Sequence, residues 1–439
     1  MPKVNKNIKY LEYLLIFLLT SYLYLSKIDQ IKFHGDESTW ITTSLYFDEL
    51  TKGNINSPIW DPGYWTLTTP PVTRYIIGIS RKLNDIGTEK LNKVWDFSKD
   101  KETNIQLGAM PSPELLKIAR TPMTIMAIFS ILLVFYCTRK YMGILVSYTL
   151  FILIISNNYF TLHLSRAMSE SPLLLFIILV MILLYFTVRL WMSYDKPIFK
   201  NKKNLITLTL SISLIGIMIG TAGGIKLNGF ALLGVSILLY VLLLFFSHYL
   251  NNISVKARVL LLSSIVGILT FTSFTTFIAS NPFLYKNTID RSVALFKWRI
   301  HEMDFQTNES KSVDLTSLDF TKRVLRVGSN IFNKYSSISF KGASLLNFLL
   351  FLTGFIIVVR KSMEFLKGNK SNLCYLTLLL TLIIVAGPSL LTPLDWDRYF
   401  YLPVFFSTIL ISIGIAEILR FIYMNSRIQN LTILHHGRS

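Results

Sequence analysis

The four residues HGDE at 34–37 bring two adjacent carboxylates to the end of an apolar segment that runs from about Leu11 to Leu25. A carboxylate at the middle of a bilayer costs about 2.5–3.5 kcal/mol on insertion scales, so this pair must lie in water or in a polar cavity. Ionisable residues at a membrane boundary indicate a functional site. A structural role is an open alternative, with Asp36 as a helix N-cap and Glu37 in the first helical turn.

Three later segments offer further charged groups for such a site. Carboxylates can act as the general base of a reaction, and cations can hold a phosphate. The segments are SRAMSE (165–170) with Arg166 and Glu170, GTAGGIKLNG (220–229) with Lys226, and RYFYLP (398–403) with Arg398.

Structural roles stay open for these residues as well. Arg166 can pair with Glu170 four residues later, and Lys226 can extend to the lipid interface. Arg398 is flanked by two aspartates and can belong to an ion cluster with them.

The composition defines the class of protein. Of 439 residues, 52% are hydrophobic and 13% aromatic, and the mean hydropathy is +0.49. These values exclude an ordinary soluble domain, and the long apolar stretches predict an all-α membrane protein. The ten predicted spans are 10–26, 120–136, 143–162, 172–189, 205–222, 226–247, 258–280, 343–359, 373–391 and 399–419. We expect one polytopic region, 1–420, followed by a short cytoplasmic tail, 421–439.

The basic residues orient the predicted spans. Cations concentrate on the cytoplasmic side of membrane proteins, and this rule places both termini in the cytoplasm. The net charge of +19 then reflects topology and membrane lipids, and no nucleic-acid partner is expected. The cations predicted to face the cytoplasm are Lys3, Lys6, Lys9, Arg139, Lys140, Arg189, Lys196, Lys200, Lys202, Lys203, Lys256, Arg258, Arg360, Lys361, Lys367, Lys370, Arg420, Arg427 and Arg438.

Two outer segments, 27–119 and 281–342, are too long to be simple connectors. The first contains two stretches, 34–50 and 72–83, whose apolar residues recur at helical spacing, so we expect amphipathic helices on the membrane surface. The second of these helices is predicted to keep its cations off the apolar face, and the polar stretch 84–113 is predicted to be a mobile insertion. The apolar face is Val72, Tyr75, Ile76, Ile79 and Leu83, and the cations off it are Arg74, Arg81 and Lys82.

No motif in the sequence requires a metal or a nucleotide. Asp36, Glu37 and Glu170 can in principle hold a divalent cation, but the chain lacks a His/Cys cluster with ligand spacing. The histidines at 34 and 163 are on the predicted outer side, where lone histidines are more often structural than catalytic. The chain has two cysteines, Cys137 and Cys374, which fall near cytoplasmic span ends and are predicted to be packing residues without a disulfide.

The order of these landmarks resembles the GT-C superfamily of polytopic glycosyltransferases, in particular the branch that contains protein O-mannosyltransferases and the lipid A aminoarabinose transferase. The similarity runs from Leu11 to about Arg420. It implies an inverting enzyme that transfers a sugar from a polyprenyl-phosphate donor on the outer face of the cytoplasmic membrane. The motifs that carry it are HGDE (34–37), TTPPVTRY (68–75), SRAMSE (165–170), GTAGGIKLNG (220–229), NPFLY (281–285) and RYFYLP (398–403).

The resemblance also assigns roles. It implies that Asp36 is the general base, that Glu37 orients the acceptor or a nearby cation, and that Glu170 closes the site. The cations that would hold the donor phosphate are Arg166, Lys226, Arg398 and Arg74.

Other functions stay open at this stage. The acceptor can be a glycan, a lipid or a protein, and the sugar is undetermined. A lipid-linked sugar transporter or flippase, a polysaccharide polymerase and a non-catalytic scaffold are the alternatives. A transporter typically carries charges within its spans and has related halves, which this sequence does not indicate.

Overall fold

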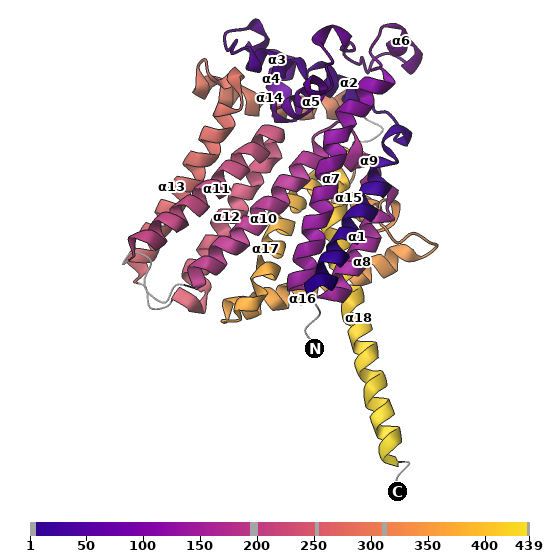
Figure 1. Cartoon of the computed structure of the whole chain (residues 1–439), viewed down its shortest axis with the longest axis vertical. Helices are drawn as coiled ribbons and strands as arrows, with labels where there is room; N and C mark the ends of the chain where they lie inside the picture. Colours follow the sequence, from indigo (N-terminus) through magenta and orange to yellow (C-terminus); the bar gives the residue numbers. More distant parts are fainter. Residues whose placement is uncertain (1–5, 194–200, 251–253, 310–313, 437–439) are drawn as a thin grey trace.

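The computed structural model describes residues 6–193, 201–250, 254–309 and 314–436. Within these ranges the regular elements are helices, and a single isolated bridge joins Asp314 to Leu394. Figure 1 shows a bundle of long helices with a layer of short helices at one end, and both chain ends lie toward the other end. The predicted cytoplasmic cations Lys3, Lys196, Lys200 and Arg438 lie outside the described residues.

In the described part of the chain, nine helical segments are long and apolar enough to cross a membrane, and a bent helix pair is a tenth candidate. Each of the ten predicted spans overlaps one of these over nearly its whole length, so the prediction of a multi-pass all-α membrane protein is confirmed. The segments are α1 (Lys6–Leu25), α7 (Pro113–Tyr141), α10 (Glu170–Met192), α11 (Lys202–Ile225), Leu227–Phe246 containing α12 (Ala231–Val241), α13 (Val255–Ala279), α16 (Ala343–Leu366), Lys370–Leu390 containing α17 (Leu373–Thr381), and Asp397–Tyr423, which enters α18 (Tyr401–His436).

The third predicted span, 143–162, is not one straight helix. It consists of α8 (Ile144–Ile155) and α9 (Asn158–Ser165), which meet at an angle of 71°. Asn157 lies at the break, where its side chain accepts a hydrogen bond from the Tyr159 backbone N–H at 2.9 Å. The Asn157 amide also donates to the Tyr335 carbonyl at 3.0 Å, so the break is fixed by a contact with a distant loop.

Glycines allow α16 and α18 to lie in close contact. A Cβ at Gly354 would collide with the Leu410 backbone, and a Cβ at Gly414 would collide with the Leu350 backbone. Small residues at helix contacts are typical of membrane bundles, because they let two backbones approach. α18 itself continues past residue 420 without a break, so the start of the predicted tail at 421 stays a prediction.

The layer at one end of the bundle is built mainly from the first outer segment. It contains α2 (Gly35–Thr42), α3 (Leu45–Thr51), α4 (Tyr64–Thr68), α5 (Val72–Leu83) and α6 (Lys101–Gln106). The second outer segment adds α14 (Thr288–Glu309), whose Leu295 packs with Leu67 at the end of α4.

The predicted orientation of α5 is wrong. Arg74 and Arg81 are buried, whereas Ile79 and Leu83 are exposed. Arg81 is accommodated because it pairs with Asp48 and donates to the Ile86 carbonyl at 2.5 Å. Buried charges are tolerated when they are paired and hydrogen-bonded. The face of α5 was predicted from the spacing of residues within the helix, and Asp48 and Ile86 lie outside it.

The stretch 84–113, predicted to be a mobile insertion, follows a defined path instead. The Asn104 side chain accepts from the Asp96 N–H at 2.8 Å and donates to the Asp96 and Asp100 carbonyls at 2.8 and 2.9 Å. The Asn92 amide donates to the Ser38 hydroxyl at 2.8 Å and so fixes the stretch to α2. Backbone groups that are paired in this way hold the stretch around α6 in place, although most of it lies outside regular helices.

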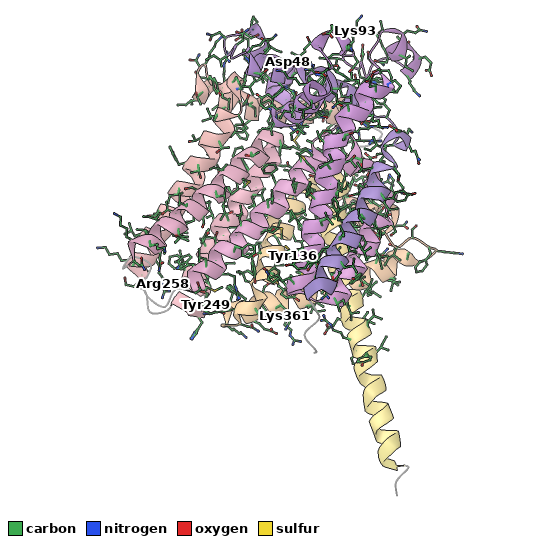
Figure 2. All side chains as sticks on the ribbon, viewed as in Figure 1. Asp48, Lys93, Tyr136, Tyr249, Arg258 and Lys361 are labelled. Atoms are coloured by element: carbon green, nitrogen blue, oxygen red, sulfur yellow. The ribbon has the colours of Figure 1, made fainter. Side chains whose placement is uncertain are left out.

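Figure 2 shows Arg258 and Lys361 at the end of the bundle opposite to Asp48 and Lys93. This separation agrees with the predicted loop assignment, while the side of the membrane on which each end lies stays a prediction.

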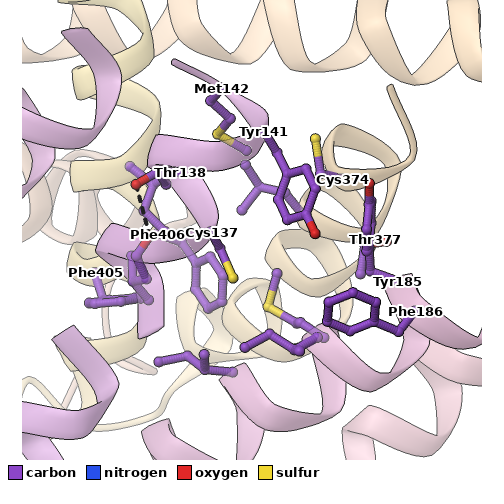
Figure 3. A pocket seen from close by; sticks show the side chains of 16 residues that line it. Cys137, Thr138, Tyr141, Met142, Tyr185, Phe186, Cys374, Thr377, Phe405 and Phe406 are labelled. Atoms are coloured by element: carbon purple, nitrogen blue, oxygen red, sulfur yellow. Dashed lines mark hydrogen bonds between the residues drawn. The ribbon is translucent and has the colours of Figure 1, made fainter. Parts of the chain in front are cut away.

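The two cysteines line a small apolar cavity of about 90 Å³ between α7, α10, α17 and α18, seen in Figure 3. Cys137 and Cys374 are both free thiols, as expected. Thr138 beside Cys137 satisfies its hydroxyl by donating to the Val134 carbonyl of its own helix at 2.8 Å. The two thiols therefore pack among apolar side chains.

Candidate functional site

The HGDE motif forms the start of α2. His34 is the N-cap: its Nδ1 accepts from the Asp36 N–H at 3.1 Å, and the Glu37 carboxylate accepts from the His34 N–H at 3.0 Å. This capping box satisfies two backbone donors at the helix start. The open structural alternative is thus partly correct, because the motif does begin a helix, although the cap is His34 and not Asp36.

Glu37 lies behind the site and is completely buried. Its two carboxylate oxygens accept from Arg120 Nε and Nη2 at 2.7 and 2.8 Å, and Oε1 also accepts from the Ala167 N–H at 2.9 Å. Arg120 in turn donates to the carbonyls of Ile28 and Ile31 at 2.9 and 3.0 Å. Glu37 therefore joins α2, α7 and the loop before α10, and in this way it fixes the position of Asp36.

Asp36 faces a cavity and forms an ion pair with Arg398. The Arg398 guanidinium carbon also lies 4.9 Å from the Trp396 ring centroid and 5.4 Å from the Tyr399 ring centroid, within cation–π range. The start of the last span is thereby joined to the first outer segment.

In the described part of the chain, the Arg398 guanidinium is paired with Asp36 and not with its flanking aspartates, although Asp397 Oδ1 accepts from the Arg398 backbone N–H at 2.7 Å. Asp395 accepts from Arg326 Nε at 2.6 Å. The Asp397 carboxylate lies 3.5 Å from His163 Nε2, and His163 is buried at the end of α9.

Glu170 and Lys226 form a second charged pair on the same cavity. Glu170 Oε1 lies 3.6 Å from Lys226 Nζ, and the Glu170 side chain is almost fully buried. Its other oxygen, Oε2, has no hydrogen-bond partner among the described residues. Lys226 Nζ lies 6.0 Å from the Tyr399 ring centroid, so Lys226 and Arg398 both lie close to the ring of one tyrosine. The pairing of Arg166 with Glu170 that the sequence left open is replaced by this Lys226 contact.

The cavity has a volume of about 530 Å³ and lies between the layer of short helices and the bundle. It brings together Asp36, Glu170, Lys226, Arg398 and Arg74 from the predicted site. A cavity of a few hundred cubic ångströms with aromatic walls and a small number of convergent charges is typical of a binding site for a small polar group. Its aromatic lining includes Trp40, Tyr64, Trp65, Trp95, Phe97 and Tyr399.

Arg74 and Arg166, two of the predicted phosphate ligands, donate hydrogen bonds to backbone carbonyls. Arg74 lines the cavity, but its Nη2 donates to the Trp65 carbonyl at 2.7 Å, and its guanidinium lies 4.7 Å from the Tyr46 ring centroid. Arg166 is not among the residues that line the cavity; it is buried and its Nε donates to the Lys32 carbonyl at 3.3 Å. Burial lowers the pKa of Arg166, although nearby Glu37 and Asp397 partly offset that effect.

Sequence analysis missed the contribution of α14. Arg299, Glu302 and Gln306 line the cavity, and Glu302 accepts from the Tyr64 hydroxyl at 2.9 Å and from Gln306 Nε2 at 2.8 Å. The signal was present, because these three residues recur at i, i+3 and i+7 and therefore share one face of a helix. Arg120 was also missed, since it was counted as the first residue of a span.

The electrostatic environment of the site keeps His34 neutral. Burial and the neighbouring cations Arg398 and Arg166 lower the pKa of His34 to about 4. Its Nδ1 can therefore accept the capping hydrogen bond at neutral pH. Within the described ranges, no three side chains of His, Cys, Asp or Glu lie close enough together to hold a metal ion.

No protein-family model matches the chain, and no curated protein matches it. Solved structures do. The oligosaccharyltransferase AglB from Archaeoglobus fulgidus, in complex with an inhibitory peptide and a dolichol-phosphate, matches 95% of this chain with 12% identity and a TM-score of 0.54. An Archaeoglobus fulgidus oligosaccharyltransferase tethered to an acceptor peptide matches 96% of the chain with 13% identity and a TM-score of 0.55. This chain spans about half of each of these two chains, 51% in both cases.

At this level of identity, the matches show the fold. The chain is a multi-pass membrane protein with the GT-C fold, as the motif order predicted.

Proposed function

We propose that the protein is a membrane glycosyltransferase that moves a sugar from a polyprenyl-phosphate donor to an acceptor on the outer face of the cytoplasmic membrane, with inversion at the anomeric carbon. The observation that carries this proposal is the shared cavity, in which an outer-segment carboxylate, Asp36, lies beside cations from three other parts of the chain. The GT-C fold supports it, and so does the dolichol-phosphate bound by AglB.

The donor phosphate is assigned to Lys226, Arg398 and Arg299. As the bond between the anomeric carbon and the phosphate oxygen breaks, its electron pair moves to that oxygen, and the negative charge of the phosphate grows. Cations fixed in a partly enclosed cavity stabilise this charge more than bulk water does. Arg299 adds a cation from α14 that the sequence resemblance did not include.

The general base is assigned to Asp36. The acceptor hydroxyl oxygen forms the new bond to the anomeric carbon while its proton moves to the Asp36 carboxylate. Attack from the face opposite to the phosphate inverts the anomeric carbon. Glu170 is assigned to the orientation of Lys226, with which it is paired, and its unpartnered oxygen is available to the acceptor.

A lipid-linked sugar flippase is the second candidate. The observation in its favour is the bent pair α8 and α9, because discontinuous helices are common in transporters. Such a protein would move the donor without breaking the glycosidic bond. A polysaccharide polymerase would be a glycosyltransferase of the proposed kind whose acceptor is a growing glycan.

The test measures donor binding and sugar transfer by the purified protein, with a polyprenyl-phosphate sugar that is radiolabelled in the sugar. Asp36→Asn should reduce single-turnover transfer about 10²–10⁴-fold, because the general base is lost while the shape is kept. Lys226→Gln should weaken donor binding by about 1.5–3 kcal/mol, the range for a hydrogen bond to a charged group.

Two controls accompany these variants. Asp29→Asn removes an exposed carboxylate that pairs with Lys117 outside the cavity and should leave both measurements unchanged. Arg166→Gln tests whether Arg166 binds phosphate, as the sequence suggested, or only holds the loop before α10 through the Lys32 carbonyl. Weaker donor binding would support the first role, and unchanged donor binding would support the second. Transfer by Asp36→Asn within a few-fold of the parent would refute the base assignment and make Glu170 the next candidate.

A further inference from the structure

The second outer segment contains the amphipathic helix α15 (Phe320–Ser329), in which Phe320 and Val324 lie on a different side from Lys322. Three apolar side chains point away from the protein: Phe320 is 79% exposed, Val324 52% and Leu325 67%. Val327, seven residues after Phe320 and on the same face, is buried in the main core of the bundle, so this face leaves the protein surface toward the start of α15. Lys322, 72% exposed, points away from Phe320 and Val324. Neighbouring exposed apolar side chains such as Phe320 and Val324 form a patch, and such patches typically mark a contact with a membrane or another protein.

The height of α15 in the molecule indicates what this partner is. Figure 1 places α15 below the layer that contains α2, α5 and α6, at the level of the long helices of the bundle. The chain enters the span α16 at Ala343, shortly after α15 ends. A side chain exposed at this level faces the lipid that surrounds the spans. Helices with one apolar and one basic side typically lie at the boundary between acyl chains and headgroups.

α15 is also fixed to the wall of the cavity. Arg326 pairs with Asp395, and the Asn330 amide that follows the helix donates to the same carboxylate. Arg323 Nη2 donates to the Thr392 carbonyl at 2.8 Å. These contacts hold the segment 392–395, of which Thr392 and Leu394 line the cavity.

A second contact ties the same segment to the chain that leads into α15. The Leu315 N–H donates to the Pro393 carbonyl at 2.7 Å, next to the bridge between Asp314 and Leu394. Arg398, which pairs with Asp36, follows this doubly held segment by a few residues. A displacement of α15 would therefore be transmitted directly to Arg398.

We propose that α15 is a lipid-contacting helix, with Phe320 and Val324 among the acyl chains of the leaflet at the cavity end and Lys322, which pairs with Asp319, at the level of the headgroups. The partner is the phospholipid leaflet itself. By lying at a fixed depth in that leaflet, α15 sets the position of the segment 392–398 relative to Asp36. The proposal rests on exposure, depth and contacts, and it holds whether or not the protein is a glycosyltransferase.

The experiment measures lipid contact directly. In the full chain with Cys137→Ala and Cys374→Ala, a single cysteine is introduced by Phe320→Cys, Val324→Cys or Lys322→Cys and carries an environment-sensitive fluorophore. The protein is placed in nanodiscs of phosphatidylcholine with a nitroxide near the top of the acyl chain. Quenching at 320 and 324 should exceed quenching at 322 by at least about twofold, since a helix at the interface directs one side into the acyl region.

Two outcomes would overturn the proposal. Equal, weak quenching at all three positions would place α15 in water. Weak quenching at 320 and 324 together with crosslinking between two copies through those cysteines would show that a second copy covers this face. The use of two apolar positions keeps the test decisive if one variant does not fold.

Discussion

At the residue scale, Asp36 and Glu37 illustrate how adjacent carboxylates acquire different roles. Successive residues of a helix point about 100° apart, so when one side chain faces the cavity its neighbour is directed toward the protein. Glu37 consequently meets Arg120 and the Ala167 N–H, whereas Asp36 meets Arg398. The sequence identified the motif and its position near a membrane boundary. It did not reveal which carboxylate is accessible, because Arg120 is far away along the chain.

The burial of Glu37 leads to a prediction about stability. Glu37→Gln should lower the free energy of unfolding by about 3–5 kcal/mol, because Arg120 would remain as an uncompensated buried charge. Denaturant titration of the purified protein measures this change. The double variant Glu37→Gln/Arg120→Met should recover part of the loss, while a single Glu37→Gln variant as stable as the parent would show that the pair is not essential to the fold.

A second residue-scale prediction concerns pH. The pKa of His34 is about 4 in the folded protein and about 6.5 in an unfolded chain. Between these values the unfolded state binds more protons, so stability falls as the pH is lowered from 6.5 toward 4. His34→Asn keeps a side-chain oxygen that can cap α2 but does not titrate.

The measurement is the difference in unfolding free energy between the parent and His34→Asn as a function of pH. This difference should be constant above pH 6.5 and should shift in favour of the variant below it. A difference that does not change with pH would mean that protonation of His34 is not coupled to folding.

At the scale of elements, hydropathy predicted the spans because each must satisfy its backbone groups within the bilayer and keep an apolar exterior. The break between α8 and α9 was not predictable in this way, since it depends on the contact between Asn157 and Tyr335. The face of α5 was predicted wrongly because Arg81 pairs with Asp48, and because both Arg81 and Arg74 donate hydrogen bonds to backbone carbonyls of other parts of the layer. Local patterns thus fail where tertiary partners decide burial.

The contact between α3 and α5 can be tested at Gly78. A Cβ at this position would meet Phe47 and the Ser44 carbonyl, so Gly78→Ala should destabilise the protein by about 1–3 kcal/mol through overpacking. Gly267→Ala in α13 is the matched control, because nothing lies near the added Cβ, and alanine should be neutral or stabilising in a helix by up to about 1 kcal/mol. Thermal unfolding compares the two, and equal midpoints for both variants would contradict the close packing of α5 on α3.

At the scale of the whole molecule, the site is assembled from segments that are remote in sequence. The motif order indicated the GT-C fold and most of the cavity-lining charges, but the pairs that they form, Asp36 with Arg398 and Glu170 with Lys226, depend on the three-dimensional arrangement. Arg166 was included because it lies in the same motif as Glu170. In the structure, the turn before α10 directs the two side chains to different surroundings.

The orientation in the membrane is a testable property of the entire chain. With Cys137 and Cys374 replaced, Asn308→Cys near the end of α14 should react with a membrane-impermeant thiol reagent in intact cells, and Lys202→Cys at the start of α11 should not. The expectation follows from the concentration of cations in the segments predicted to be cytoplasmic. Labelling at 202 and not at 308 would reverse the orientation and would place the cavity in the cytoplasm.

The ion pair between Glu37 and Arg120 has a practical consequence for immunisation. The segment 27–119, which is predicted to lie on the outer side, contains the layer of short helices and would be chosen as an antigen, but it ends one residue before Arg120. Produced alone, it would leave Glu37 without its buried partner and α5 without the bundle beneath it. Antibodies raised against such a fragment would recognise linear epitopes, whereas binders to the native surface require the whole chain as immunogen, for example in nanodiscs.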